Sequence, residues 1–136
     1  MSAADRRYRV LIVDDEESIL QFVERVLRDA GYETTLAANA NTALELAATH
    51  EQFDLLLTDL MMPGIQGDEL ARRLRQQHPE LKVLYLTGFA DRLFAERLVL
   101  WANEAFIEKP VTVAGLREAV SLALFGHIRG LEPRRV

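Results

Sequence analysis

The chain has 136 residues, of which 49% are hydrophobic, and this size and composition are typical of one compact globular domain. It contains no cysteine, which excludes disulfides, thiolate metal sites and cysteine nucleophiles and is typical of a protein of the reducing cytoplasm. The formal net charge is −5, the charged residues are interspersed, and no apolar stretch approaches the ~20 residues of a membrane span, so we expect neither nucleic-acid binding nor membrane insertion.

Short apolar runs alternate along the chain with longer segments of helical period, which is typical of strand–helix units around a parallel sheet. In chain order, we predict a strand at 8–13, a helix at 17–30, a strand at 34–38, a helix at 42–49, a strand at 53–58, a helix at 67–77, a strand at 83–86, a helix at 91–102, a strand at 105–107 and a helix at 113–125. Residues 1–7 are expected to form a short N-terminal extension, and residues 126–136 a flexible C-terminal tail. The sequence therefore predicts a single α/β domain over residues 8–125.

Several of the predicted helix ends carry sequence signals. Gly31 and Gly126 are expected to end the first and the last helix, because glycine readily adopts the left-handed conformation that follows a helix. Asn39 or Asn41 is able to cap the second helix and Thr112 the last, because short polar side chains accept hydrogen bonds from the free N–H groups of a first turn.

Polar residues stand where the predicted strands end. In chain order they are Asp14-Asp15-Glu16-Glu17, Asp59, Thr87-Gly88 and Lys109-Pro110. In open parallel sheets, ligands bind at the carboxyl ends of the strands. A single Asp at such a place is more often a helix cap or a solvated loop residue, but the four strand ends together indicate one site.

If these strand ends converge, three carboxylates meet, and their repulsion destabilises the site unless a cation or protonation relieves it. Oxygen ligands without cysteine or clustered histidine favour Mg²⁺, with Mn²⁺ as the alternative. Such an ion would neutralise an incoming phosphate, and Lys109 would hold a phosphate oxygen as a point charge. A carboxylate beside a divalent ion, a lysine and a hydroxyl therefore favours phosphoryl transfer onto the carboxylate.

Four segments resemble the response-regulator receiver domains of two-component signalling. They are VLIVDDE at 10–16, TDLMMPG at 58–64, LTG at 86–88 and FIEKP at 106–110. The resemblance covers about residues 7–124. It implies a doubly wound, flavodoxin-like (βα)₅ fold of three layers, with a parallel sheet in the strand order 2-1-3-4-5.

The resemblance also implies roles for individual residues. Asp59 would accept the phosphoryl group, Asp15 would bind Mg²⁺ directly, and Asp14 would act on the ion through water. Asp59 and the backbone carbonyl of Met61 would complete the metal ligands, and Lys109 would pair with the phosphoryl group. Such a domain is a phosphoacceptor rather than an enzyme, and only self-phosphorylation and self-dephosphorylation are expected of it.

The implied signal leaves through a switch. Thr87 resembles the hydroxyl that moves toward the phosphate, and Phe106 the aromatic residue that follows it inward. The readout surface would then be formed by the helix at 91–102, the strand at 105–107 and the helix at 113–125. The implied partners are a histidine kinase or histidine phosphotransfer protein, and a second copy or an effector on the readout surface.

The sequence departs from the family pattern in two places. Phe106 stands where tyrosine is frequent, so an inward state of this ring must rest on packing alone. The usual Gly-Ala pair before the fifth strand is Ala102-Asn103. Lys109-Pro110 matches the family pattern, and the resemblance implies a cis peptide there.

Two other classes of protein compete with this interpretation. Haloacid-dehalogenase-type phosphatases also use an Asp nucleophile, Mg²⁺ and a lysine, but they need a second Asp two residues later, where this chain has Met61 after Asp59 and Glu16 after Asp14. A receiver-like scaffold that is not phosphorylated would normally lack one of the residues that phosphorylation requires. All of these residues are present, namely Asp15, Asp59, Thr87 and Lys109. The LTGFAD stretch also resembles receivers of hybrid kinases, so the chain is either a stand-alone domain or a piece of a larger protein.

Overall fold

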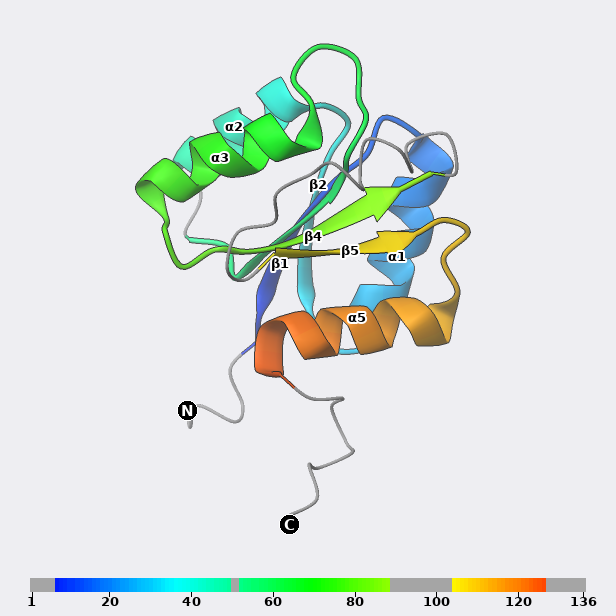
Figure 1. Ribbon diagram of the computed structural model, residues 1–136. Coiled ribbons are helices and arrows are strands. Elements are labelled where there is room, and N and C mark those ends of the chain that lie inside the picture. Colours follow the sequence, from blue (N-terminus) through cyan, green and yellow to red (C-terminus); the bar gives the residue numbers. More distant parts are fainter. Residues whose placement is uncertain (1–6, 50–51, 89–103, 127–136) are drawn as a thin grey trace.

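The computed structural model describes residues 7–49, 52–88 and 104–126 (Figure 1). The helix predicted at 91–102 therefore lies outside the described residues, as do 1–6 of the extension and 127–136 of the tail. Within the described residues, no helix is long and apolar enough to cross a membrane.

One parallel sheet forms the centre of the fold. Its strands are β1 (Arg9–Val13), β2 (Glu33–Ala37), β3 (Leu55–Asp59), β4 (Lys82–Thr87) and β5 (Glu104–Glu108). They lie in the order β2-β1-β3-β4-β5, and every neighbouring pair is parallel. The predicted strand order is confirmed.

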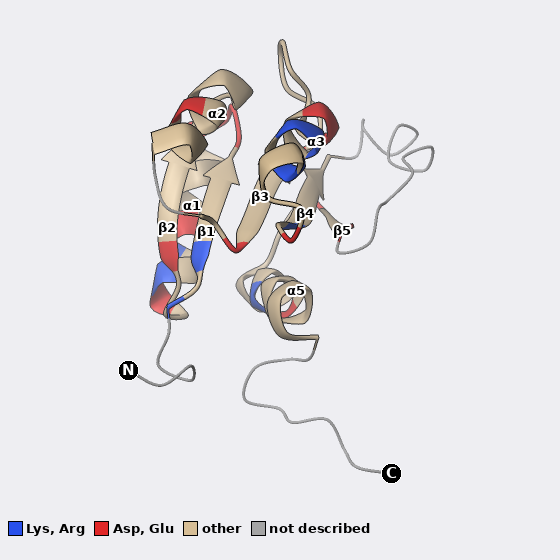
Figure 2. Cartoon of the chain, turned by 90° about the vertical axis from the view of Figure 1, so that its left-hand side faces the viewer, with Lys and Arg blue, Asp and Glu red and all other residues tan. Residues whose placement is uncertain are grey.

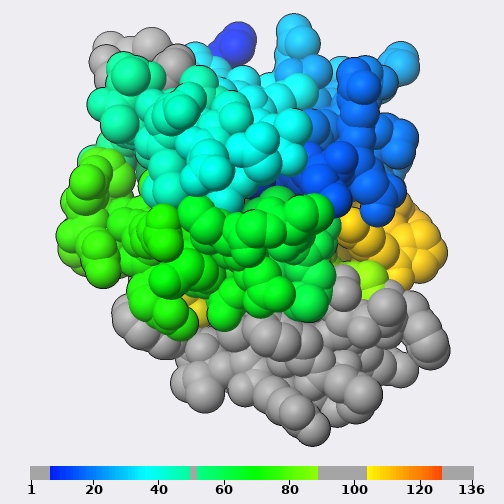
Figure 3. All heavy atoms as spheres, turned by 90° about the horizontal axis from the view of Figure 1, so that it is seen from above, coloured from blue at the N-terminus to red at the C-terminus, as the bar shows by residue number. Residues whose placement is uncertain are grey.

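Helices cover both faces of this sheet, which gives the three predicted layers (Figure 1). The helices of the described residues are α1 (Glu17–Asp29), α2 (Ala40–Thr49), α3 (Gly67–Gln77) and α5 (Val113–Phe125). α1 and α5 pack on one face, and α2 and α3 on the other, where they lie side by side (Figure 3).

The two hydrophobic clusters meet across β3, the middle strand. Leu56 packs with α2 and α3, whereas Leu55 and Leu57 pack with α1 and α5. All residues of β3 are buried, because helices cover both faces of a doubly wound sheet and a central strand has no solvent side. A strand buried on both faces therefore appears in the sequence as the uninterrupted apolar run before Asp59.

The predicted elements within the described residues are all present, with bounds that differ by two residues at most. The prediction of β3 at 53–58 was wrong at both ends. Phe53 joins the cluster beneath α2 and α3 without entering the strand, and β3 continues to Asp59 because this residue still pairs with Leu86 of β4. Asp59 is thus the last residue of its strand rather than the first residue of the loop.

Hydrogen bonds at two helix starts decide which side chains cap. The Thr42 N–H donates to Asn39 Oδ1 at 2.8 Å, so Asn39 rather than Asn41 caps α2. The helix predicted from residue 42 consequently begins at Ala40, two residues earlier. Thr112 caps α5 as predicted, since its hydroxyl oxygen accepts from the N–H three residues later in the first turn.

Candidate functional site

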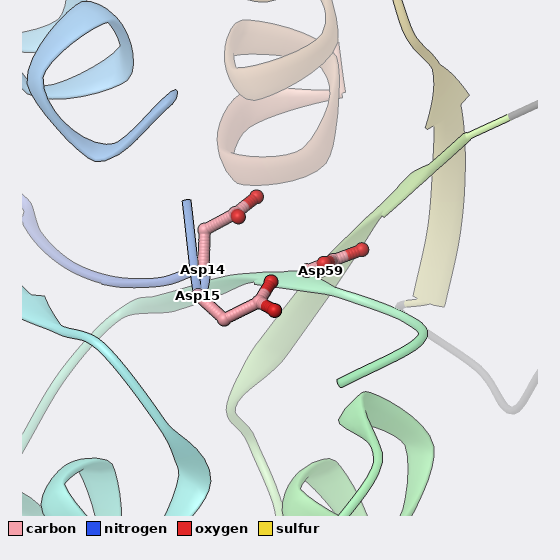
Figure 4. Close-up of side chains that lie close together, drawn as sticks. All are labelled: Asp14, Asp15 and Asp59. Carbon is pink, nitrogen blue, oxygen red and sulfur yellow. The ribbon is translucent and has the colours of Figure 1, made fainter. Parts of the chain in front are cut away.

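The ends of β1 and β3 bring three carboxylates together (Figure 4). Asp14 and Asp15 follow β1 directly, and Asp59 ends the adjacent strand β3. One carboxylate oxygen of each residue lies within 4.8 Å of those of the other two. The convergence expected from the parallel sheet is present, with two buried carboxylates and one exposed one.

Two hydrogen bonds hold the buried Asp14, one to β2 and one within the loop between β1 and α1. Its N–H donates to the Ala37 carbonyl at the end of β2, 3.2 Å away. Its Oδ1 accepts the N–H of Glu16 at 2.9 Å. These bonds direct the other oxygen, Oδ2, toward the space that Asp59 and Lys109 border, while Asp15 stays open to solvent.

Lys109 enters the site from the end of β5. Its Nζ lies 3.2 Å from Asp14 Oδ2 and 3.7 Å from Asp59 Oδ1. Its N–H donates to the Thr87 carbonyl at 2.8 Å, which joins the ends of β4 and β5, and the Lys109–Pro110 peptide is cis as the resemblance implies. One ammonium group thus faces two buried carboxylates.

The proton affinities of these groups are strongly perturbed. Burial raises the pKa of Asp59 to about 7, and the nearby Asp14 adds to this rise while Lys109 opposes it. Burial also raises the pKa of Asp14, although the Glu16 N–H and Lys109 act in the opposite direction. Burial opposes the charge on Lys109, yet Asp14 and Asp59 together raise its pKa above the ordinary value. The cluster therefore holds more negative charge than one lysine balances.

Two oxygens of the cluster are buried and accept no hydrogen bond from the described residues, namely Asp14 Oδ2 and Asp59 Oδ1. Both oxygens face the Lys109 ammonium group, which compensates only part of their negative charge, so they favour a further positive ligand. Together with Asp15 they offer only oxygen atoms, at a spacing that one small ion is able to bridge. This donor set fits Mg²⁺ or Mn²⁺, since both prefer carboxylate oxygens and keep several waters.

The remaining predicted site residues are Thr87, Phe106 and Met61. Thr87 is buried, and its hydroxyl lies 3.5 Å from the Ile107 carbonyl, to which it donates. Phe106 is 42% exposed, in register with Tyr85 of β4. Met61 is half-buried, and its side chain packs against the hydrophobic core beneath α2 and α3. In this arrangement the Thr87 hydroxyl contacts the β5 main chain.

Sequence reasoning missed two residues that touch the main chain of Asp59. The Thr58 hydroxyl donates to the Asp59 carbonyl oxygen at 3.0 Å, and Gly67 lies so close that a Cβ there would overlap the same oxygen. The sequence contains a partial signal for Gly67. Glycine has a low helix propensity, so a glycine at the first position of a predicted helix indicates some other requirement there. Thr58 begins the matching segment at 58–64, but sequence reasoning assigned it no role.

Comparison with known proteins agrees with the geometry. The model of the response regulator receiver domain family matches residues 10–121. Among solved structures, a response regulator receiver protein from Sinorhizobium medicae matches with a TM-score of 0.77 and 30% sequence identity, over 88% of this chain and 95% of that one.

Two curated relatives from Brucella abortus differ greatly in length. The response regulator receiver protein CpdR is 42% identical over 82 residues, which are 60% of this chain and 68% of CpdR. The sensor kinase CckA is 33% identical over 112 residues, which are 82% of this chain and 12% of the kinase. The chain thus matches most of one relative and a small part of the other.

Proposed function

Since the chain belongs to the response regulator receiver domain family, we propose that it accepts a phosphoryl group on Asp59 from a histidine kinase or a histidine phosphotransfer protein. Receiver domains of two-component systems interact with such proteins and bind Mg²⁺ at an acidic pocket. One observation carries the proposal: the buried Asp59 carboxylate lies beside two further carboxylates and 3.7 Å from an ammonium group.

The chemistry is a transfer to a carboxylate nucleophile. An oxygen of Asp59 forms a bond to phosphorus while the bond from phosphorus to the donor histidine nitrogen breaks, and the electron pair stays on that nitrogen. Lys109 compensates the charge of a phosphoryl oxygen, which its distance to Asp59 supports. Asp14, Asp15, Asp59 and the Met61 carbonyl would hold Mg²⁺, which would supply further positive charge.

The signal then leaves through Thr87 and Phe106. A modification shifts a two-state protein only by its different affinity for the two states. Thr87 supplies such a difference, because its hydroxyl leaves the Ile107 carbonyl in order to bind the phosphoryl group. Phe106, 42% exposed here, moves inward into the space near Thr87.

The readout surface comprises residues 91–102, β5 and α5. Phe106 and Leu122 support this proposal, since they expose 42% and 50% of their surface on β5 and α5. A second copy of the chain or an effector binds there.

The receiver domain comprises residues 8–125, with 1–7 and 126–136 as extensions of a cytoplasmic protein. The family match at 10–121 supports these limits.

The decisive experiment is incubation with acetyl phosphate and Mg²⁺, followed by intact-mass measurement. The wild type should gain one phosphoryl group, and Asp59→Asn should gain none. Asp54→Asn is the matched control, because Asp54 stands just before the other end of β3, where its Oδ2 accepts the Arg9 N–H. A wild type that gains no phosphoryl group, or an Asp59→Asn variant that still gains one, would contradict the proposal.

A further inference from the structure

The peptide that follows Asp59 makes hydrogen bonds to β4 and to the side chain of Thr58. The next N–H, that of Leu60, donates to the Leu86 carbonyl at 2.9 Å. The Asp59 carbonyl oxygen accepts the hydroxyl of Thr58 at 3.0 Å, and the Thr58 side chain is fully buried. The peptide between Asp59 and Leu60 is therefore fixed on both its N–H and its carbonyl side.

Gly67 closes the loop that follows Asp59. It is the first residue of α3, and its N–H donates to the Leu60 carbonyl at 2.9 Å. A Cβ on Gly67 would overlap the Asp59 carbonyl oxygen and would lie 3.1 Å from Leu60 Cα. Both of these neighbours are main-chain atoms, which are unable to rotate away, so the close approach requires glycine.

These contacts bear on the direction of the Asp59 side chain. The peptide unit is planar, so its orientation constrains the backbone dihedral next to the Asp59 Cα and thereby the direction of the Cα–Cβ bond. A small rotation of this peptide would displace the carboxylate relative to Asp14 and Lys109, which approach it from β1 and β5. The loop at 60–66 would move with it, and Met61 lies on this loop.

We propose that Thr58 and Gly67 are positioning residues for the acceptor carboxylate. They fix the peptide that follows Asp59, and neither lies among the residues whose carboxylates or ammonium group form the cluster. The inference rests on the proposed function, because it concerns the same carboxylate. It adds that the reactivity and metal affinity of Asp59 depend on a hydroxyl and a glycine that lie behind its main chain.

Two substitutions of Thr58 separate positioning from packing. Thr58→Val keeps the shape of the side chain and removes the hydroxyl, whereas Thr58→Ser keeps the hydroxyl and removes a buried methyl group. Loss of one hydrogen bond predicts a phosphorylation rate with acetyl phosphate that is lower by roughly fivefold for Thr58→Val and near the wild-type rate for Thr58→Ser. The opposite order would show that Thr58 acts by packing and would overturn its role.

Gly67→Ala tests the second contact, with Gly126→Ala as the matched control. Gly126 ends α5 at a φ of 77°, and a Cβ added there would meet no atom within 4 Å, so its substitution strains the backbone away from the site. Both variants should be less stable than the wild type. Only Gly67→Ala should slow phosphorylation, by roughly tenfold or more, since the displaced peptide misdirects the carboxylate. Equal rates for the two variants would overturn the role of Gly67, and if Gly67→Ala does not fold, the Thr58 pair decides the proposal.

Titration with Mg²⁺ alone distinguishes failure of this inference from failure of the proposed function. Thr58→Val should raise the Mg²⁺ dissociation constant roughly fivefold and Thr58→Ser should leave it unchanged, whether or not the wild type accepts a phosphoryl group. A wild type that binds Mg²⁺ but gains no phosphoryl group would contradict the proposed function alone. Unchanged metal affinity and unchanged phosphorylation in Thr58→Val would contradict the inference alone.

Discussion

The surroundings of the Asp59 side chain disfavour the ionised form of its carboxyl group. The residue is 4% exposed and has Asp14 as a like-charged neighbour, and its Oδ1 accepts no hydrogen bond from the described residues. The Lys109 ammonium group compensates only part of this charge, because it also faces Asp14. A carboxylate in such surroundings retains its proton to a higher pH than it does in the unfolded chain.

This raised pKa predicts how stability depends on pH in metal-free buffer. The folded pKa of Asp59 is about 7 and the ordinary value is 3.8, so the folded protein binds more protons between these two values. The contribution of Asp59 is fully present below about pH 4 and is lost as the pH rises through about 7. Urea unfolding of the wild type and of Asp59→Asn at several pH values checks this. The free energy of unfolding should fall with pH less steeply in the variant, and parallel curves would refute the assignment.

The sequence identified the residues of this site but not the contacts that hold them. Asp14, Asp15, Asp59 and Lys109 were predictable, because each follows or ends an apolar run that indicates a parallel strand. The contact between Thr58 and its neighbour was not, because a threonine before Asp59 fits an ordinary strand equally well. Which hydroxyl meets which carbonyl depends on dihedral angles that no spacing in the sequence encodes.

Among the packed elements, a buried ion pair joins α3 to β5. Arg75 Nη1 lies 3.0 Å from Glu104 Oε2, and their side chains are 8% and 6% exposed. Arg72 and Arg73 of α3 are exposed, and Figure 2 shows acidic and basic residues on this helix. The pair lies near Tyr85 of β4, whose pKa is raised by burial and then by the Glu104 carboxylate. It thus ties the last turn of α3 to the first residue of β5.

Removing one member of this pair should destabilise the protein more than removing both. Arg75→Met removes the arginine partner of the buried Glu104 carboxylate, which should cost about 3–5 kcal/mol of unfolding free energy. The double variant Arg75→Met/Glu104→Leu should recover part of this loss, because neither charge is then buried. A double-mutant cycle by urea unfolding measures the coupling. Additive effects of the two substitutions would show that the ion pair is not a coupled unit.

The start of α2 offers a second prediction with an internal control. Asn39→Ala removes the hydrogen bond to the Thr42 N–H and should cost about 1 kcal/mol of unfolding free energy. Asn41→Ala, two residues further along, should change stability by less than about 0.5 kcal/mol, because Asn41 is exposed within the helix. Thermal or urea unfolding of both variants compares them. Equal losses would mean that the cap is not the residue that the structure indicates.

The molecule as a whole is expected to respond to a divalent ion. A ligand that binds only the folded state stabilises it, by about 2.7 kcal/mol at a concentration of about 100 times its dissociation constant. Added Mg²⁺ should therefore raise the midpoint of thermal unfolding, and excess chelator should reverse the shift. Asp15→Asn should lose most of this shift, and its metal-free stability should be no lower than that of the wild type, because Asp15 is exposed and its charge repels the Asp59 carboxylate. A full Mg²⁺ shift in Asp15→Asn would remove this residue from the metal ligands.

Local patterns in the sequence were sufficient to predict the strands and helices of the described residues and the edge of the sheet at which Asp14, Asp15, Asp59 and Lys109 meet. Apolar period and turn residues define the elements, and strands in one parallel sheet end at one edge. Only the packed fold established that two buried carboxylate oxygens share one ammonium group, that Arg75 meets Glu104 across 29 residues of sequence, and that Gly67 lies against the Asp59 carbonyl. These contacts join segments that become neighbours only when the helices pack on the sheet, and the free energy of a buried polar group depends on those neighbours rather than on its place in the chain.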